Sequence, residues 1–145
     1  MQPSTEGLQH ELGRLFAHLG RHIRANESAN PGVYAVLARL GKGEAMRASD
    51  LAAGEGTDAS TMSRRLAQMA ERGLVERVPD PDDRRAWLVR ATDAGTRAFR
   101  AERTRRVALV TDRVADWEPA DVEHLAGLIA RLNTAFERSE EGRSK

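Results

Sequence analysis

The sequence contains no cysteine among its 145 residues. This absence excludes disulfide bonds, thiolate metal sites, cysteine nucleophiles and thiol-based redox sensing. The chain also lacks any run of about 18 consecutive apolar residues, the least that a transmembrane helix needs. Its first 15 residues have neither a basic segment nor an apolar segment of the kind that a secretory signal combines. We therefore expect no membrane span, no signal peptide and a cytoplasmic location.

The sequence has no large excess of charge of either sign, because it contains 23 basic and 22 acidic residues. A net charge of +1 excludes a strongly basic tail as the basis of nucleic-acid binding, although it leaves a locally basic surface open. Lysine is scarce, because Lys42 and Lys145 are the only two and every other base is arginine. Codon usage explains this bias, and so does the suitability of arginine for bidentate phosphate and base contacts; composition does not separate the two.

The spacing of apolar residues predicts a mainly α-helical chain with one small β-hairpin. Turn-forming and capping residues set the expected boundaries of each element, and Ser49-Asp50 is the expected N-cap pair of a short third helix. The expected helices cover 7–27, 31–40, 49–54, 58–73, 93–115 and 119–137, and the expected strands cover 74–78 and 86–91. From Arg138 onward the sequence is polar and reads as a tail.

The helices at 49–54 and 58–73 are separated by a short link with Gly54 and Gly56, as a helix-turn-helix requires. On the second helix, steps of four and three residues predict that Met62, Leu66 and Met69 face the core. The opposite side offers hydroxyls for phosphates, arginines for guanine and a glutamine for adenine. The candidate DNA contacts on this helix are Ser60, Thr61, Ser63, Arg64, Arg65 and Gln68. The alternative is an ordinary surface helix with solvated arginines.

The hairpin tip reads PDPDDRR and places two adjacent arginines, Arg84 and Arg85, at the end of a wing. Arginines there could reach the DNA backbone or the minor groove, whose negative potential attracts them. Acidic residues beside DNA phosphates are electrostatically unfavourable, unless one of them fixes the direction of an arginine through an ion pair. The alternatives are a solvated loop with compensating charges and a calcium loop, which lacks the glycine and the distal glutamate of an EF-hand.

Three motifs in residues 50–95 together resemble the winged helix-turn-helix of the MarR family of bacterial transcriptional regulators. They are DLA at 50–52, S-x-x-L-x-x-M-x-x-R-G-L-V-E-R at 63–77, and DDRR with T-x-x-G within 82–95. The flanking helices match the family in layout alone. One departure is Arg90-Ala91-Thr92, where the family usually ends the strand in L-T.

The resemblance implies a homodimer whose recognition helix enters the major groove of double-stranded DNA. It also implies that either Arg84 or Arg85 enters the minor groove, with Asp82 or Asp83 orienting it. Members of the family often bind a small aromatic or anionic effector between the winged lobe and the dimer helices. The sequence does not assign the residues that would bind such an effector.

A homodimer is also expected from two apolar stripes near the ends of the chain. The stripes consist of Leu8, Leu12, Leu15 and Leu19, and of Val122, Leu125, Ile129, Leu132 and Phe136. A small winged core offers little surface to cover both stripes, although they could also cover each other within one chain. We therefore predict a winged helix-turn-helix domain at 31–95 and a helical dimerisation region formed by 1–30 and 96–145.

Signals for other chemistry are weak. His18 and His22 are four residues apart and could share a metal, but no cysteine and no well-spaced carboxylate joins them. Gly41-Lys42-Gly43 lacks the spacing of a P-loop, and no G-x-S-x-G or H-E-x-x-H motif occurs. We expect no metal, no cofactor and no enzyme, but a DNA-binding repressor on a pseudo-palindromic operator. The alternative is a winged-helix protein–protein adaptor.

Overall fold

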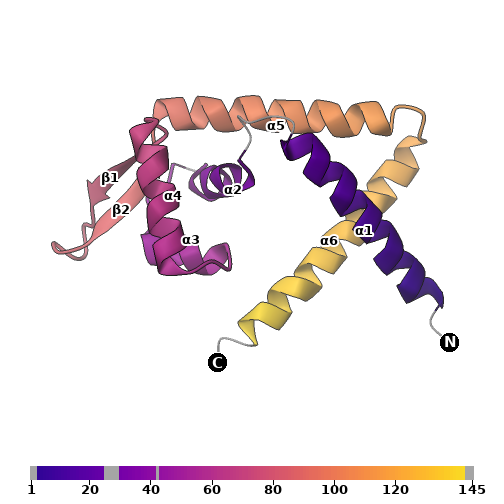
Figure 1. The fold of residues 1–145 in the computed structure, drawn as a ribbon, viewed down its shortest axis with the longest axis horizontal. Helices are drawn as coiled ribbons and strands as arrows, with labels where there is room; N and C mark the ends of the chain where they lie inside the picture. Colours follow the sequence, from indigo (N-terminus) through magenta and orange to yellow (C-terminus); the bar gives the residue numbers. More distant parts are fainter. Residues whose placement is uncertain (1–2, 25–29, 42, 143–145) are drawn as a thin grey trace. The chain divides into compact units, whose positions relative to one another are not determined.

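The computed structural model describes residues 3–24, 30–41 and 43–142 of the chain. Its elements follow the order α1 (Pro3–Arg24), α2 (Pro31–Leu40), α3 (Ala48–Gly54), α4 (Ala59–Glu71), β1 (Val75–Pro79), β2 (Trp87–Ala91), α5 (Asp93–Arg113) and α6 (Pro119–Glu141). This mainly α-helical chain with one antiparallel hairpin confirms the expected fold class (Figure 1). The helix predicted at 7–27 begins earlier, and residues 25–27 lie outside the described part.

Two compact units divide the chain, Met1–Arg103 and Thr104–Lys145, so the boundary falls within α5. The first unit holds a hydrophobic core built by α2, α3, α4, the hairpin and Phe99 of α5. The buried core residues are Val36, Leu37, Leu40, Leu51, Ala52, Met62, Leu66, Met69, Leu74, Val75 and Val89. The predicted three-part division at residues 30 and 95 stays a prediction.

The hairpin pairs β1 with β2 in the register Val75↔Ala91 to Pro79↔Trp87. A third segment joins this ladder, because the N–H of Met46 donates to the C=O of Val89 at 2.9 Å and the reverse bond is 2.7 Å. The residues before α3 are thereby held extended against the wing.

The N-cap predicted for α3 is wrong. The helix begins at Ala48 with Arg47 as its N-cap, so Ser49 and Asp50 lie within the first turn. The bridge at Met46 explains this, since it keeps the chain extended up to Arg47, whose carbonyl then accepts from the N–H groups of Asp50 and Leu51. The polar tail predicted after Arg138 is likewise too early, because α6 continues to Glu141.

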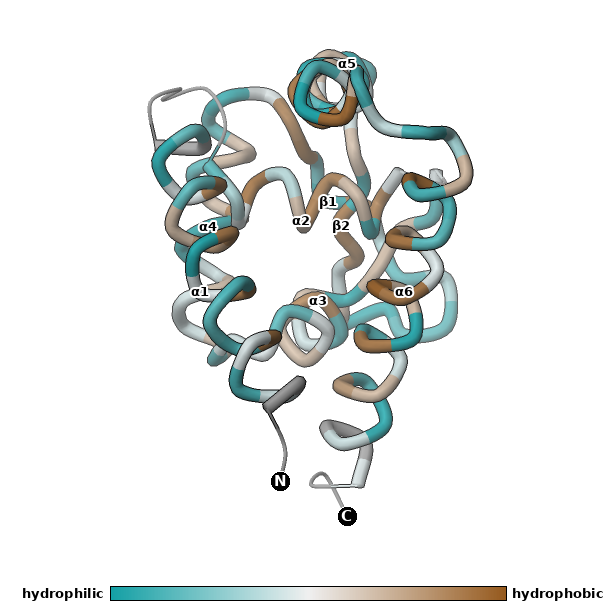
Figure 2. The backbone as a smooth tube through the Cα atoms, turned by 90° about the vertical axis from the view of Figure 1, so that its right-hand side faces the viewer, coloured by the Kyte–Doolittle hydropathy of each residue, from teal (hydrophilic) through white to brown (hydrophobic). Residues whose placement is uncertain are grey.

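Helices α1 and α6 each carry apolar residues that recur from turn to turn (Figure 2). On α1, Leu8 and Leu15 are exposed while Leu12 and Leu19 are half-buried. On α6, Leu125, Ile129 and Phe136 are exposed while Val122 and Leu132 are half-buried. The structure adds Phe16 and Leu128 to the exposed apolar residues of these helices. Each helix therefore retains an apolar surface that the described chain leaves open to solvent.

Candidate nucleic-acid interface

Helix α4 buries one face and exposes the other, as the spacing of its apolar residues predicted. Met62 and Met69 are fully buried and Leu66 is 7% exposed, which confirms the predicted core face. The outer side forms a continuous stripe at steps of three and four residues, because that spacing returns to the same side of a helix. The exposed stripe consists of Ser60, Ser63, Arg64, Ala67, Gln68 and Glu71.

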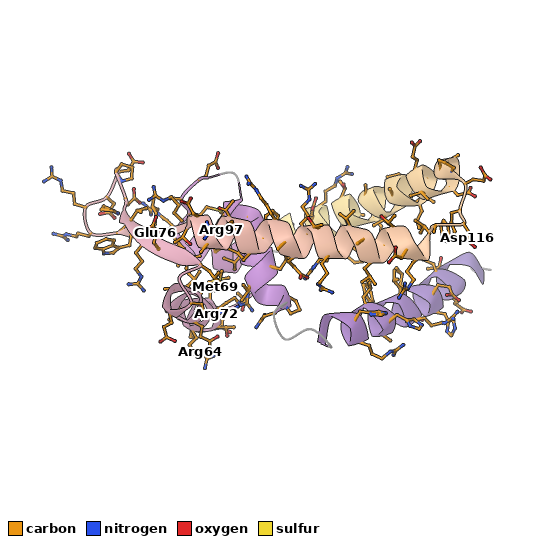
Figure 3. The ribbon with its side chains drawn as sticks, turned by 90° about the horizontal axis from the view of Figure 1, so that it is seen from above. Arg64, Met69, Arg72, Glu76, Arg97 and Asp116 are labelled. Carbon is orange, nitrogen blue, oxygen red and sulfur yellow. The ribbon has the colours of Figure 1, made fainter. Side chains whose placement is uncertain are left out.

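The two adjacent arginines of α4 have different surroundings. Arg64 belongs to the exposed stripe and its side chain extends outward from the helix (Figure 3). Arg65 is half-buried, and its guanidinium carbon lies 2.5 Å from the position that a Cβ on Gly32 of α2 would occupy. Any side chain at Gly32 would displace this guanidinium. The sequence did not separate the two arginines, whereas the structure turns Arg64 outward and Arg65 against α2.

The N-terminus of α4 is capped by Asp58. Its carboxylate accepts from the N–H of Thr61 at 2.7 Å, from the hydroxyl of Thr61 at 2.8 Å and from the hydroxyl of Ser60 at 3.1 Å. The bonds to the backbone and side chain of Thr61, followed by the bond from Ser60, lower the pKa of Asp58 from 3.8 to about 2. In this arrangement the Ser60 and Thr61 hydroxyls donate to Asp58, so toward a ligand they act as acceptors.

The depressed pKa predicts how the stability contributed by Asp58 depends on pH. A group whose pKa is lower in the folded state stabilises the fold above its unfolded pKa and loses that contribution as pH falls through its folded pKa. We therefore expect Asp58→Ala to lower the urea midpoint of unfolding at pH 7 and pH 5. The difference from the unsubstituted protein should shrink as pH falls from about 4 to about 2. A difference of constant size between pH 5 and pH 2 would contradict this role.

The turn between α3 and α4 is held by Arg39 of α2. Its Nε donates to Oε1 of Glu55 at 2.5 Å, and its Nη2 donates to the carbonyl of Gly54. Gly54 leaves room for this guanidinium, because a Cβ there would lie 2.6 Å from its central carbon. Gly56, with φ of 59°, adopts the left-handed backbone that completes the turn. These contacts fix the angle at which α4 leaves α3.

The wing tip exposes Arg84 and Arg85, the two predicted minor-groove candidates. The carboxylate of Asp83 accepts from the backbone N–H of Arg85 at 2.9 Å, so it shapes the turn that carries both arginines. Asp82 is exposed at the same tip. That either carboxylate orients an arginine side chain stays a prediction.

Asp80, the first acidic residue of the turn, pairs with an arginine outside the wing tip. Its side chain is buried, and its Oδ2 accepts from Nη2 of Arg47 at 2.7 Å and from Nε at 3.1 Å. Its Oδ1 accepts from the N–H of Asp82 at 2.9 Å. The hydrogen bond from the N–H of Asp82 lowers the pKa of Asp80, and the hydrogen bond and positive charge of Arg47 lower it further. Burial of the carboxylate opposes these effects. This ion pair ties the base of the wing to the start of α3.

Among the residues that the structure describes, no group of three or more histidines, aspartates or glutamates is placed to hold a metal ion. His18 lies beside Arg21, whose Nη2 is 2.8 Å from its Nδ1. Within the same described residues, no helix combines the length and the apolar character needed to cross a membrane.

Comparison with known proteins identifies the fold and shows which proteins this chain is similar to. The sequence model of the MarR family matches residues 30–87. The uncharacterized HTH-type transcriptional regulator YxaD of Bacillus subtilis is 29% identical over 138 residues, covering 93% of this chain and 96% of the relative. The PcaV transcriptional regulator of Streptomyces coelicolor, solved in complex with its natural ligand, is 26% identical with a TM-score of 0.65 over 88% of this chain and 90% of that chain.

A MarR family protein from Bacillus stearothermophilus has the same fold at 18% identity, with a TM-score of 0.76 over 92% of this chain and 94% of that chain. The matched residues 30–87 span α2, α3, α4 and the wing up to Trp87, which are the elements that build and position the exposed face of α4. This chain is therefore similar to transcriptional regulators of the MarR family, whose model matches its winged helix-turn-helix at residues 30–87.

Proposed function

We propose that this protein is a homodimeric repressor that recognises a pseudo-palindromic DNA operator. The observation that carries the proposal is the division of α4 into a buried apolar face and an exposed stripe containing Ser60, Ser63, Arg64 and Gln68. A helix of 13 residues is about 20 Å long and fits the major groove, where arginine and glutamine distinguish guanine and adenine. The wing arginines, at the tip of the adjacent hairpin, supply the minor-groove contact.

Selection from a pool of random duplexes tests this function. A twofold dimer carries two copies of α4 and reads half-sites about one helical turn, roughly 10 bp, apart. We expect the protein to enrich an inverted repeat with that spacing at low ionic strength. A pool that stays random after several rounds, with a folded protein, would favour a protein–protein adaptor instead.

The second copy of the chain is proposed to cover the apolar residues of α1 and α6. Leu125 and Ile129 are each 40% exposed and Phe136 is 59% exposed, which is unusual for large apolar residues that recur along one side of a helix. Burying such a stripe against an identical stripe removes apolar surface from water at about 25 cal/mol per Å². Homodimers with a twofold axis bury surface in this self-complementary way.

The substitution Ile129→Glu tests the dimer. We expect the unsubstituted protein to elute with twice the 16.0 kDa mass of one chain, and the variant to shift toward the monomer at micromolar concentration. Light scattering during size-exclusion chromatography measures this mass. Arg131→Glu is the matched control, because it adds the same carboxylate to an exposed position away from the apolar stripe. An unsubstituted protein that runs as a monomer would contradict the proposal.

A small-molecule effector is part of the proposal, supported by the ligand complex of the PcaV regulator. The winged unit has a cavity of about 30 Å³ beside Tyr34 and Phe99, whose rings stack with centroids 5.2 Å apart. A space of this size holds about one water molecule. An aromatic effector would therefore have to move these rings to enter here.

A further inference from the structure

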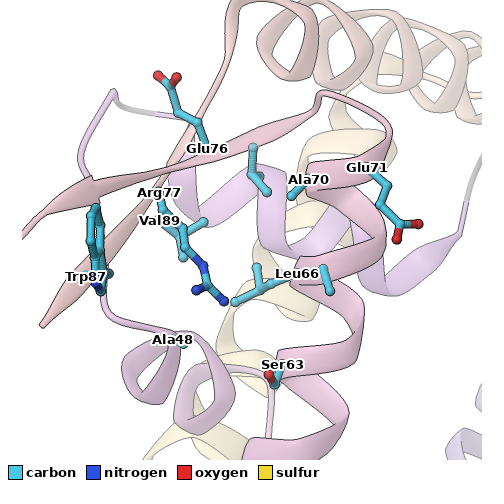
Figure 4. A pocket seen from close by; sticks show the side chains of 11 residues that line it. Ala48, Ser63, Leu66, Ala70, Glu71, Glu76, Arg77, Trp87 and Val89 are labelled. Atoms are coloured by element: carbon cyan, nitrogen blue, oxygen red, sulfur yellow. The ribbon is translucent and has the colours of Figure 1, made fainter.

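A groove of about 510 Å³ lies between the recognition helix α4 and the wing (Figure 4). One wall comes from α4 and the other from β1 and β2, with Ala48 at the start of α3 closing one end. The lining residues are Ala48, Ser63, Leu66, Ala67, Ala70, Glu71, Val75, Glu76, Arg77, Trp87 and Val89. The groove therefore shares Ser63, Ala67 and Glu71 with the exposed stripe of α4.

The charged side chains of this groove point in different directions. Strand alternation places Arg77 on the same face of the hairpin as Val75 and as its partner Val89, and Figure 4 shows its guanidinium turned inward toward Leu66. Glu76 projects from the opposite face, where its Oε1 accepts from Nη2 of Arg90 at 2.7 Å. Glu71 also points away from the groove. One cation thus faces into a space whose walls are largely apolar.

The rim of the groove carries an exposed indole. Trp87 is 57% exposed at the start of β2, opposite Pro79 in the hairpin register. An exposed tryptophan contributes little to the core, yet it offers a flat apolar face and one N–H donor to a bound molecule. A ligand that combines negative charge with an apolar body matches both Arg77 and Trp87.

The identity of this ligand follows from the proposed mode of DNA binding, so the inference rests on the proposed function. A helix in the major groove and a wing in the adjacent minor groove lie on either side of one DNA strand, so that strand must pass between them. We propose that the groove holds the sugar–phosphate backbone of this strand. The Arg77 guanidinium binds a phosphate, and the Trp87 indole packs against the neighbouring deoxyribose. This contact positions the duplex and carries no base preference.

The pair Arg77→Gln and Arg90→Gln tests the contact on the enriched operator. Both variants remove one positive charge per chain from the same hairpin, but Arg90 lies on the face away from the groove. We expect Arg77→Gln to weaken binding by about five- to tenfold per chain at 0.1 M salt and to reduce the slope of log K against log salt by about 0.9 per chain. The loss should be equal for all duplexes, and Arg77→Lys should restore the slope.

Arg90→Gln should keep the salt slope of the unsubstituted protein. Equal slopes for Arg77→Gln and Arg90→Gln would overturn the inference, as would a loss confined to one base pair. Urea midpoints of the two variants show whether the hairpin remains folded, so that a folding defect is not taken for a lost contact.

Ethylation of single phosphates locates the contact directly. We expect ethylation of the phosphates between the major-groove half-site and the wing's minor groove to block the unsubstituted protein, and to block Arg77→Gln no further. If those phosphates are insensitive while others block binding, the inference fails and the proposed function stands. If no duplex is bound at all, the proposed function fails as well. Benzoate that stabilises the unsubstituted protein but not Arg77→Gln, with an unchanged DNA salt slope, would instead assign the groove to a free anion.

Discussion

Replacing Gly95 with alanine is expected to lower the free energy of unfolding by about 3 kcal/mol or more, at the upper end of what overpacking costs. A Cβ at this position would lie 2.0 Å from the backbone oxygen of Leu74 and 3.3 Å from Cδ2 of Leu37. The nearer atom belongs to the backbone and cannot turn aside as a flexible side chain does. The first turn of α5 and the start of the wing would have to separate.

The same region is fastened by hydrogen bonds that this separation would break. The N–H of Thr92 donates to the carbonyl of Leu74 at 3.1 Å, and its hydroxyl donates to the carbonyl of Gly73 at 2.5 Å. That hydroxyl also accepts from the N–H of Gly95 at 3.0 Å, so Thr92 caps the N-terminus of α5. In the T-x-x-G motif, the Thr92 hydroxyl therefore bonds the residue that follows α4 and the first turn of α5. The lack of a side chain at Gly95 lets α5 approach Leu74 closely.

Urea denaturation at fixed protein concentration measures the Gly95→Ala effect. Gly127→Ala in α6 is the matched control, because no atom of the described residues outside its own stretch of helix lies within 4 Å of the added methyl group. Alanine is favoured over glycine in a helix by about 1 kcal/mol, so the control should be neutral or more stable. Equal stability of the two variants would show that α5 and Leu74 are not in the close contact described here.

The substitution Arg64→Ala is expected to weaken operator binding by about 2–6 kcal/mol per dimer, since each bidentate arginine–guanine contact contributes about 1–3 kcal/mol. Selection with this variant should also lose the preference for one base pair in each half-site. Arg64 is the exposed arginine of α4, whereas Arg65 is directed against Gly32. Fluorescence anisotropy with a labelled operator measures the affinity.

Arg72→Ala provides the control for Arg64. Arg72 is exposed at the C-cap of the same helix and has the same charge, but it lies beyond the stripe proposed to contact bases. We expect it to leave the selected sequence unchanged. If Arg64→Ala selects the same operator with the same affinity, α4 does not read the major groove through this side chain.

The sequence predicted the elements that follow from local patterns. The steps between Met62, Leu66 and Met69 identified the buried face of α4, and Gly73, with φ of 69°, ends that helix as expected. Alternating residues and a Pro- and Asp-rich turn identified the hairpin. These features depend on neighbours within a few residues, so their signal is present in any short window of the sequence.

Contacts between distant residues left no such signal. Arg47 and Asp80 are 33 residues apart, and their ion pair forms because the wing folds back beside the start of α3. The residue pattern did not single out Asp80 among the acids of the turn, and the family resemblance pointed to Asp82 or Asp83, whereas burial distinguishes Asp80 from these two. A linear pattern does not distinguish Arg64 from Arg65 either. The helix turns by about 100° per residue, and this rotation decides which of the two side chains meets α2.

In the proposed complex, α4 enters the major groove while the wing enters the adjacent minor groove. Dimethyl sulfate tests both parts in one experiment, because it methylates guanine N7 in the major groove and adenine N3 in the minor groove. We predict protection of guanine N7 in two half-sites about one helical turn apart, with flanking protection of adenine N3. Arg64→Ala should lose the N7 protection and keep the N3 protection. A bound duplex in which every guanine N7 reacts as in free DNA would contradict the account.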